Sequence, residues 1–255
     1  MSKSILVANW KNHPSSLNEA KSLLNRLSRQ SKLYKKLSFF IAPPLSYFES
    51  VSSRSKNFVH LASQDIFSSI RTASHTGEVT PDILKSFGVR LSIIGHSERR
   101  AMGETSADVS EKVKTALQSG IIPLVCVGEI SKDQDGEHFE FLREELELSL
   151  AGLKRKNDIS RLVIAYEPVW AIGKHAEDAV EPTDLSQSVM FIKKILTDMF
   201  GRNMAERIPI LYGGSVEPGN ANNLLHETGI KGFLVGHASL DAKSLGVIAN
   251  SLISK

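Results

Sequence analysis

Residues 162–173 read LVIAYEPVWAIG, a short apolar run that leads into one carboxylate, a proline and a second apolar run ending in glycine. The run Leu162 to Ala165 has the composition of a strand, and Pro168 fixes the backbone directly after Glu167. We therefore expect the Glu167 carboxylate to lie where a buried strand ends, a common place for functional side chains.

The segment after this carboxylate is apolar where loops are usually polar. It comprises Pro168, Val169, Trp170, Ala171, Ile172 and Gly173. A loop of this kind can serve as a lid, because closing over a ligand excludes water and strengthens the electrostatic interactions beneath it. A buried turn whose Trp170 packs on the core explains the same pattern, so this stretch alone leaves both interpretations open.

Length and composition predict one domain over residues 1–255. The chain is 41% hydrophobic, which suits one large core, and no linker, low-complexity run or charge block divides it. The apolar runs are too short to span a bilayer, and the first residues lead straight into a strand-like run. We expect a cytoplasmic protein without a membrane partner.

Charge and cysteine content exclude further classes of function. The net charge of +3 comes from 31 basic and 28 acidic residues without a basic stripe, so we expect no nucleic-acid partner. Cys126 is the only cysteine and lies in an apolar run, which rules out an internal disulfide and predicts a buried, unreactive side chain.

Short apolar runs alternate with segments of helical periodicity along the whole chain. Eight such runs are strand candidates: Ile5 to Ala8, Leu37 to Ile41, Phe58 to Ala62, Leu91 to Ile94, Ile121 to Val127, Leu162 to Ala165, Ile208 to Tyr212 and Gly232 to Val235. Most are apolar throughout, which is typical of strands buried on both faces of a parallel sheet.

The intervening segments carry helix signals. Apolar residues follow three-and-four spacing over 17–27, 139–153 and 185–200, and each set makes one helical stripe. Thr105 to Asp108 resembles a capping box, and Pro182 fits a first-turn proline. Eight such units in this length predict an α/β fold, a single (βα)8 TIM barrel. A doubly wound sheet is the competing fold, but residues 9–12 lack its glycine-rich fingerprint.

Polar residues gather where the predicted strands end. The segments are Asn9-Trp10-Lys11, Gly95-His96-Ser97-Glu98-Arg99-Arg100, Glu167, Tyr212-Gly213-Gly214-Ser215-Val216 and Leu234-Val235-Gly236-His237. With Thr76-Gly77-Glu78 after the first of them and Ala165 to Gly173 around Glu167, these motifs follow one another along the chain and make its whole length resemble the triosephosphate isomerase family. The resemblance implies a glycolytic isomerase acting on a small phosphorylated triose through an enediol.

The resemblance assigns roles that suit the residue types. Glu167 would be the base, since one carboxylate can serve two adjacent carbons, and His96 a neutral electrophile at a helix start. Lys11 would supply fixed positive charge and Asn9 a neutral donor. Ser97 would hold the resting Glu167. The resemblance places Glu98 among the catalytic residues, while chemistry alone permits an ion pair with Lys11 or with an arginine.

The resemblance also implies a phosphate site and an assembly. Backbone amides of Gly173, Ser215, Gly236 and His237 would hold the phosphate, with neither metal nor organic cofactor. Thr76 would contact the Asn9 and Glu98 of a second subunit in a homodimer.

Several stretches depart from the family pattern, among them Asn12-His13 in place of Met-Asn after Lys11. His237 replaces a glycine, and we hypothesise that its imidazole meets the phosphate when protonated, which a His237→Ala variant tests through the pH dependence of substrate affinity. Residues 174–180 make a lid about two residues longer than usual, which would alter its closure. Ala73-Ser74-His75 lacks the usual aromatic anchor, which could weaken a dimer.

Two other classes of function remain open. Another phosphate-handling barrel enzyme is possible because fold does not fix chemistry. A non-catalytic binder or scaffold is the second alternative. The joint presence of Asn9, Lys11, His96 and Glu167 favours the isomerase over both.

Overall fold

The computed structural model describes residues 3–55, 57–68, 75–132, 136–171, 180–226 and 228–254. Within them the strands pair in parallel and close on themselves, in the order β1 to β8. Their bounds are β1 Ile5–Asn9, β2 Ser38–Ala42, β3 His60–Ser63, β4 Val89–Ile94, β5 Ile122–Val127, β6 Val163–Tyr166, β7 Ile210–Tyr212 and β8 Gly232–Val235. Each lies within two residues of its sequence-predicted position, so the predicted TIM barrel is confirmed.

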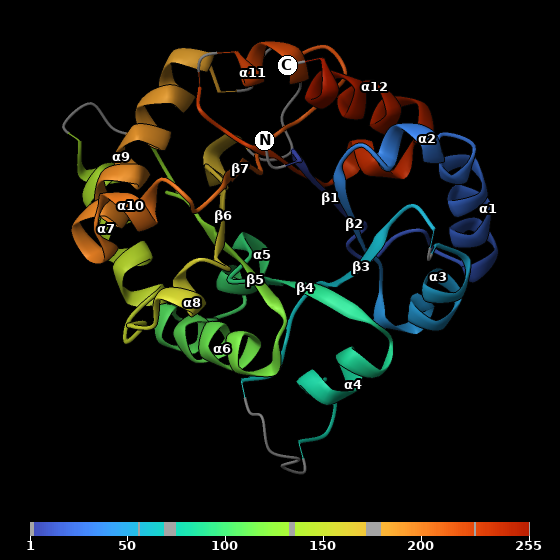
Figure 1. Cartoon of the computed structure of the whole chain (residues 1–255), viewed down its shortest axis with the longest axis horizontal. Helices are drawn as coiled ribbons and strands as arrows, with labels where there is room; N and C mark the ends of the chain where they lie inside the picture. The colour runs from blue at the N-terminus through green and yellow to red at the C-terminus, as the bar shows by residue number, and fades with distance from the viewer. Residues whose placement is uncertain are drawn as a thin grey trace.

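Helices surround the barrel as a ring (Figure 1). Their bounds are α1 Leu17–Ser28, α2 Ser31–Tyr34, α3 Phe48–Ser55, α4 Pro81–Ser86, α5 Ser97–Ala101, α6 Ser106–Ser119, α7 Glu137–Ser149, α8 Lys156–Ile159, α9 Pro182–Phe200, α10 Arg202–Ala205, α11 Ala221–Leu225 and α12 Ala242–Ile253. The 3-10 helices η1 Leu45–Tyr47, η2 Val169–Ala171 and η4 His237–Leu240 lie in loops that follow strands. In contrast to the surrounding helices, α5 lies near the middle of the barrel in this view.

The barrel closes between β8 and β1, where Gly232 pairs with Ile5. A side chain at position 232 would place its Cβ 1.7 Å from the Ile5 carbonyl oxygen. Glycine is therefore required here for the last strand to approach the first closely enough to pair.

Two apolar layers bury the strands from both sides. Val7, Ala165, Leu211 and Leu234 belong to the cluster that fills the barrel. Alternate residues such as Ile164 belong to the larger cluster shared with the helices. Because both faces are buried, the strands appear in the sequence as continuous apolar runs, and each fully buried large side chain contributes roughly 1.5–3 kcal/mol.

The predicted helix signals are confirmed, with one difference. Thr105 and Asp108 form a reciprocal capping box at the start of α6, and Pro182 occupies the first turn of α9. The apolar stripe at 139–153, however, outlasts its helix, since α7 ends at Ser149. Leu150 continues the periodicity but already has non-helical dihedral angles and is buried, because tertiary packing and not helical register sets its position.

Candidate active site

Glu167 follows β6 directly, as predicted, and points into the C-terminal end of the barrel. Its exposed fraction is only 2%. The backbone amide of Ser97 donates a hydrogen bond to its Oε2 at 3.2 Å, so Ser97 holds the carboxylate through its main chain. A buried carboxylate with one fixed donor is held ready in a single orientation.

His96 follows β4 and is the N-cap of α5. Its Nδ1 accepts a hydrogen bond from the Glu98 amide at 3.2 Å, as an N-cap side chain does. An accepting Nδ1 assigns the proton of a neutral imidazole to Nε2. That Nε2 lies 3.5 Å from Oε1 of Glu167, so both predicted catalytic groups lie side by side.

Lys11 follows β1 in a backbone conformation that side chains rarely adopt, with φ of 51°. The Asn9 Oδ1 accepts from its amide at 3.0 Å, and the Gln64 Nε2 donates to its carbonyl at 2.7 Å. The side chain makes an ion pair with Glu98, with 2.6 Å between Nζ and Oε1. Between the two partners that the sequence left open for Glu98, the structure therefore selects Lys11.

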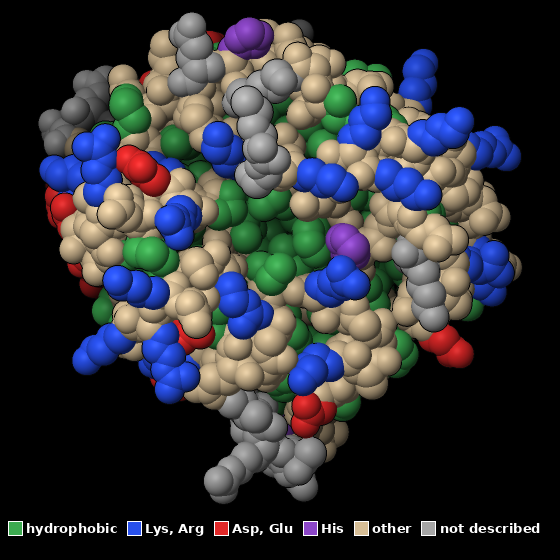
Figure 2. Space-filling model, viewed as in Figure 1, with side chains coloured by type: hydrophobic (Ala, Val, Ile, Leu, Met, Phe, Trp, Pro, Cys, Tyr) green, Lys and Arg blue, Asp and Glu red, His purple; other side chains and the backbone are tan. Residues whose placement is uncertain are grey.

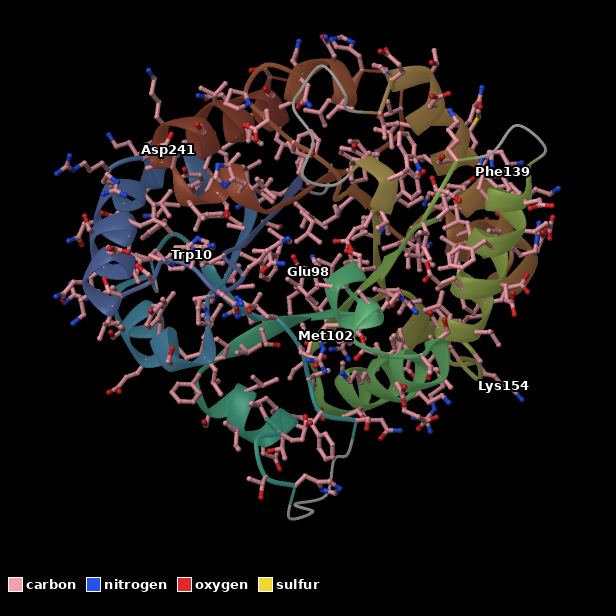
Figure 3. All side chains as sticks on the ribbon, turned by 180° about the vertical axis from the view of Figure 1, so that it is seen from behind. Trp10, Glu98, Met102, Phe139, Lys154 and Asp241 are labelled. Atoms are coloured by element: carbon pink, nitrogen blue, oxygen red, sulfur yellow. The ribbon has the colours of Figure 1, made fainter. Side chains whose placement is uncertain are left out.

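Two glycines bring the ends of β7 and β8 against these side chains. A Cβ at Gly213 would lie 2.8 Å from Cγ of Glu167, and a Cβ at Gly236 would lie 3.6 Å from Cε of Lys11. The ends of five strands, β1, β4, β6, β7 and β8, thus meet around one site. Seen from behind, Figure 3 shows Glu98 on α5 near the middle of this end, with Met102 beyond it.

The predicted phosphate residues occupy the loops after β7 and β8. Ser215 is half-buried, and its carbonyl accepts from Asn220 Nδ2 at 3.0 Å. His237 is exposed at the start of η4, directly after Gly236. Gly173 lies outside the described residues.

The described part of the predicted lid is anchored at its base. Val169 to Ala171 form η2, and the Trp170 Nε1 donates to Oε1 of Glu129 at 2.8 Å. The Tyr166 hydroxyl donates to the same oxygen at 2.8 Å, and burial is the main cause that raises the pKa of this tyrosine. Trp170 is half-buried against the core in this conformation. Ile172 and residues 174–179 lie outside the described residues.

The predicted dimer contact lies between β3 and α4. Thr76 is exposed, and the ring of the neighbouring His75 packs in a tilted arrangement on that of Phe67, with 4.7 Å between the ring centroids. Ala73 and Ser74 are not among the described residues.

Cys126 is buried beside the base, as predicted for an unreactive side chain. Burial is the largest of the causes that raise the pKa of its thiol well above the usual range, and the charge of Glu167 adds to it. The thiol therefore stays protonated and does not supply a nucleophile.

Comparison with known proteins identifies the family. A model of the family described as Triosephosphate isomerase matches residues 4–252. The chain belongs to the triosephosphate isomerase family. Its class as an isomerase follows from that membership.

Relatives in the triosephosphate isomerase family match over nearly their whole length. The protein named Triosephosphate isomerase from Geobacter metallireducens is 38% identical over 249 residues, which cover 96% of this chain and 97% of the relative. That from Thermoanaerobacter sp. strain X514 is 37% identical, with 98% and 100% covered. That from Flavobacterium johnsoniae is 34% identical, with 99% and 100% covered.

Several residues that shape this site were not assigned a role from the sequence. Gln64 follows β3 and bonds to the Lys11 carbonyl, so the rule that strand ends carry function could have found it. Glu129, which anchors Trp170, follows β5 in the same way. Glu145 lies inside α7 and contacts the site from behind, where no motif marks it.

Two searches of the described residues returned nothing. None of their His, Cys, Asp and Glu side chains form a group of three suited to a metal ion. No helix among them combines the length and apolar character needed to cross a membrane.

Proposed function

We propose that this chain interconverts D-glyceraldehyde 3-phosphate and dihydroxyacetone phosphate, with Glu167 as the base and neutral His96 as the electrophile. The observation that carries the proposal is the 3.5 Å separation of the His96 Nε2 and the Glu167 Oε1, both on buried side chains. A base and a proton donor at this spacing can act on neighbouring atoms of one small substrate.

The carboxylate of Glu167 would remove a proton from one substrate carbon and return it to the next. It has two oxygens on one side chain, so a small rotation serves both carbons. The Nε2 proton of His96 would stabilise negative charge on the substrate oxygen and exchange with it, which a neutral imidazole does without trapping the intermediate. Lys11 would stabilise both the enediolate and the phosphate, because its side chain lies beside Gly236.

Binding of the phosphate would rely on backbone amides after β7 and β8. The proposed residues are Ser215, Gly236 and His237, with Gly173 from the lid. Ser215, Gly236 and His237 lie in the loops directly after β7 and β8, and backbone amides at such positions can hold an anion. Asn9 uses its oxygen on Lys11, which leaves its amide nitrogen to donate to the substrate. No step in this reaction needs a metal or an organic cofactor.

Glu98 would act on Lys11 and not directly on the substrate. Its side chain is 59% exposed and its carboxylate holds the lysine at 2.6 Å. The pairing keeps the ammonium group at the site, and arrival of the substrate phosphate would draw Lys11 toward the new anion.

We also propose that the protein is a cytoplasmic homodimer in which Thr76 of each subunit contacts the partner subunit. The exposure of Thr76 and the closeness of Lys11 to Glu98 at an open edge of the site support this arrangement. Size measurement across a dilution series tests it, since a monomer at all concentrations would contradict it.

A coupled isomerase assay on the wild type and on Glu167→Asp tests the reaction. Shortening the side chain withdraws the carboxylate by about one bond length, so kcat should fall about 100-fold with little change in KM. Glu144→Asp on the exposed side of α7 serves as the matched control and should retain wild-type kcat.

The outcomes also separate the competing functions. An isomerase acting through an enediol should incorporate solvent deuterium into its product. A wild type that binds a triose phosphate without turnover would instead support the scaffold. Turnover with retention of the substrate proton would favour another class of barrel enzyme.

A further inference from the structure

Behind the proposed catalytic pair lies a buried ion pair to which the reaction assigns no role. Arg100 on α5 and Glu145 on α7 approach within 3.2 Å, from Nε to Oε1, with side chains that are 16% and 7% exposed. Charges buried to this degree persist only where other hydrogen bonds satisfy them. The other partners of both side chains are therefore informative.

Glu145 is connected to the base. Its Oε2 accepts a hydrogen bond from the backbone amide of Gly128 at 2.8 Å. Gly128 in turn packs against the main chain of Glu167, since a Cβ there would lie 2.0 Å from the Glu167 carbonyl oxygen. A shift of the Glu145 carboxylate therefore passes through one peptide to the backbone that carries the base.

Arg100 is connected to the electrophile. Its Nε donates to the carbonyl of Gly95, the residue before His96, at 2.9 Å. Its Nη2 donates to the carbonyl of Cys126 on β5 at 3.3 Å. One guanidinium thus ties the loop that carries His96 to the strand that leads to Gly128, which its planar fork of donors allows.

Two serines complete the hydrogen bonding of this arginine. Nη1 donates to Oγ of Ser106 and Nη2 to Oγ of Ser149, both at 3.1 Å. The guanidinium is held from α6 and α7 as well as from the barrel, so it has one favoured position.

We propose that Arg100 and Glu145 are positioning residues that fix the separation of His96 and Glu167. They touch neither reacting atom in the described structure and act through Gly95 and Gly128. This inference rests on the proposed function, because the separation matters only if the two groups act on one substrate. Arg100, Glu145 and Glu167 also line one hollow of about 240 Å³, so no packed layer separates the pair from the base.

The charges around Glu145 make the arrangement sensitive to pH. Arg100 faces it from α5, while Glu167 and Glu129 face it from the loops after β6 and β5. Burial is the largest effect and raises the pKa of Glu145 to about 7, with the two carboxylates adding to it and Arg100 opposing it. Below that pH the Glu145 carboxyl is protonated, and its ion pair with Arg100 weakens.

Glu145→Gln tests the proposal without changing the shape of the side chain. An amide can still accept from Gly128, but its NH2 group then meets the Arg100 donors. At pH 8 kcat should fall about 10-fold, with KM within about twofold, because the proposed phosphate donors lie across the barrel. The ratio of wild type to variant should shrink toward one at pH 6, where Glu145 is already protonated.

Two further variants and one control complete the design. Arg100→Lys keeps the positive charge but loses the planar set of guanidinium donors, and it should lower kcat to a similar degree. If Glu145→Gln does not fold, Glu145→Asp keeps the charge but cannot reach Arg100 and Gly128 together, so kcat should fall severalfold. Glu144→Gln removes a carboxylate from the exposed side of α7, and its kcat should match that of the wild type.

Circular dichroism and thermal melting give the folded fraction at each pH. The proposal is overturned if the Glu145 and Arg100 variants, once corrected for folded protein, keep the kcat of Glu144→Gln from pH 6 to 9. A wild type without isomerase activity would instead overturn the proposed function.

Discussion

The two ends of the barrel carry similar residue types but differ in how these residues are held. At the C-terminal end Lys11 pairs with Glu98, and His96 lies against Glu167. At the N-terminal end basic residues lie at or just before the strand starts: Lys3, Lys36, Arg90, Arg161, Arg207 and Lys231. Figure 2 shows that Lys and Arg outnumber Asp and Glu on this face, around a hollowed hydrophobic centre.

The bonds of these basic residues show the difference. Lys3 donates to the Lys35 carbonyl and Arg161 to the Leu117 carbonyl, and none of the six makes an ion pair within the described part of the chain. His60 at the start of β3 lies near Lys3 and Arg90 and 5.4 Å from the Phe40 ring. A strand end becomes a candidate site when opposite charges converge and are fixed, and polar side chains alone do not suffice.

Substituting one histidine at each end tests this distinction most strongly. His96→Gln keeps a polar side chain but cannot exchange a proton with the substrate oxygen, so kcat should fall by about 10²- to 10⁴-fold. His60→Gln should stay within about twofold of the wild type. Steady-state isomerase kinetics measure both, and an equal loss in the two variants would remove the contrast.

A pair of glycine substitutions sharpens the comparison between activity and stability. Gly213→Ala places its Cβ 2.8 Å from Cγ of Glu167 and displaces the carboxylate, so kcat should fall about 10-fold; the nearest atoms all belong to this one side chain and none to the main chain, so the loss of stability should be small. Gly232→Ala meets the Ile5 carbonyl, which is main chain, and should lower the free energy of unfolding by about 1–3 kcal/mol or more.

Kinetics and urea unfolding of the same preparations separate these two effects. The kcat of Gly232→Ala per folded molecule should match the wild type. A large kcat loss there, or a large stability loss in Gly213→Ala, would show that the two ends are not separable in this way.

The smallest expected effect concerns the pH dependence of stability at the N-terminal end. Burial lowers the pKa of His60, and the charges of Arg90 and Lys3 lower it further. As the pH falls through 6.5, the unfolded chain binds a proton that folded His60 resists, so stability is lost toward acid. The urea midpoint should therefore fall further between pH 7.5 and pH 5.5 for the wild type than for His60→Gln. Equal falls in the two proteins would contradict this.

The fold, and the strand ends at which the candidate site lies, could be predicted from the amino-acid sequence. Strands buried on both faces are largely apolar, so most of β1 to β8 are visible as runs, and parallel strands necessarily bring their ends to one rim. Residues directly after these runs, such as His96 and Glu167, could therefore be placed before the structure was known.

Which side chains contact one another could not be predicted in the same way. The choice of Lys11 for Glu98, the anchoring of Trp170 by Glu129, and the link from Glu145 through Gly128 to the base all join segments far apart in the chain. Such contacts depend on how α5 and α7 pack on the barrel and on the rotamers this packing permits, and local sequence patterns carry no record of either.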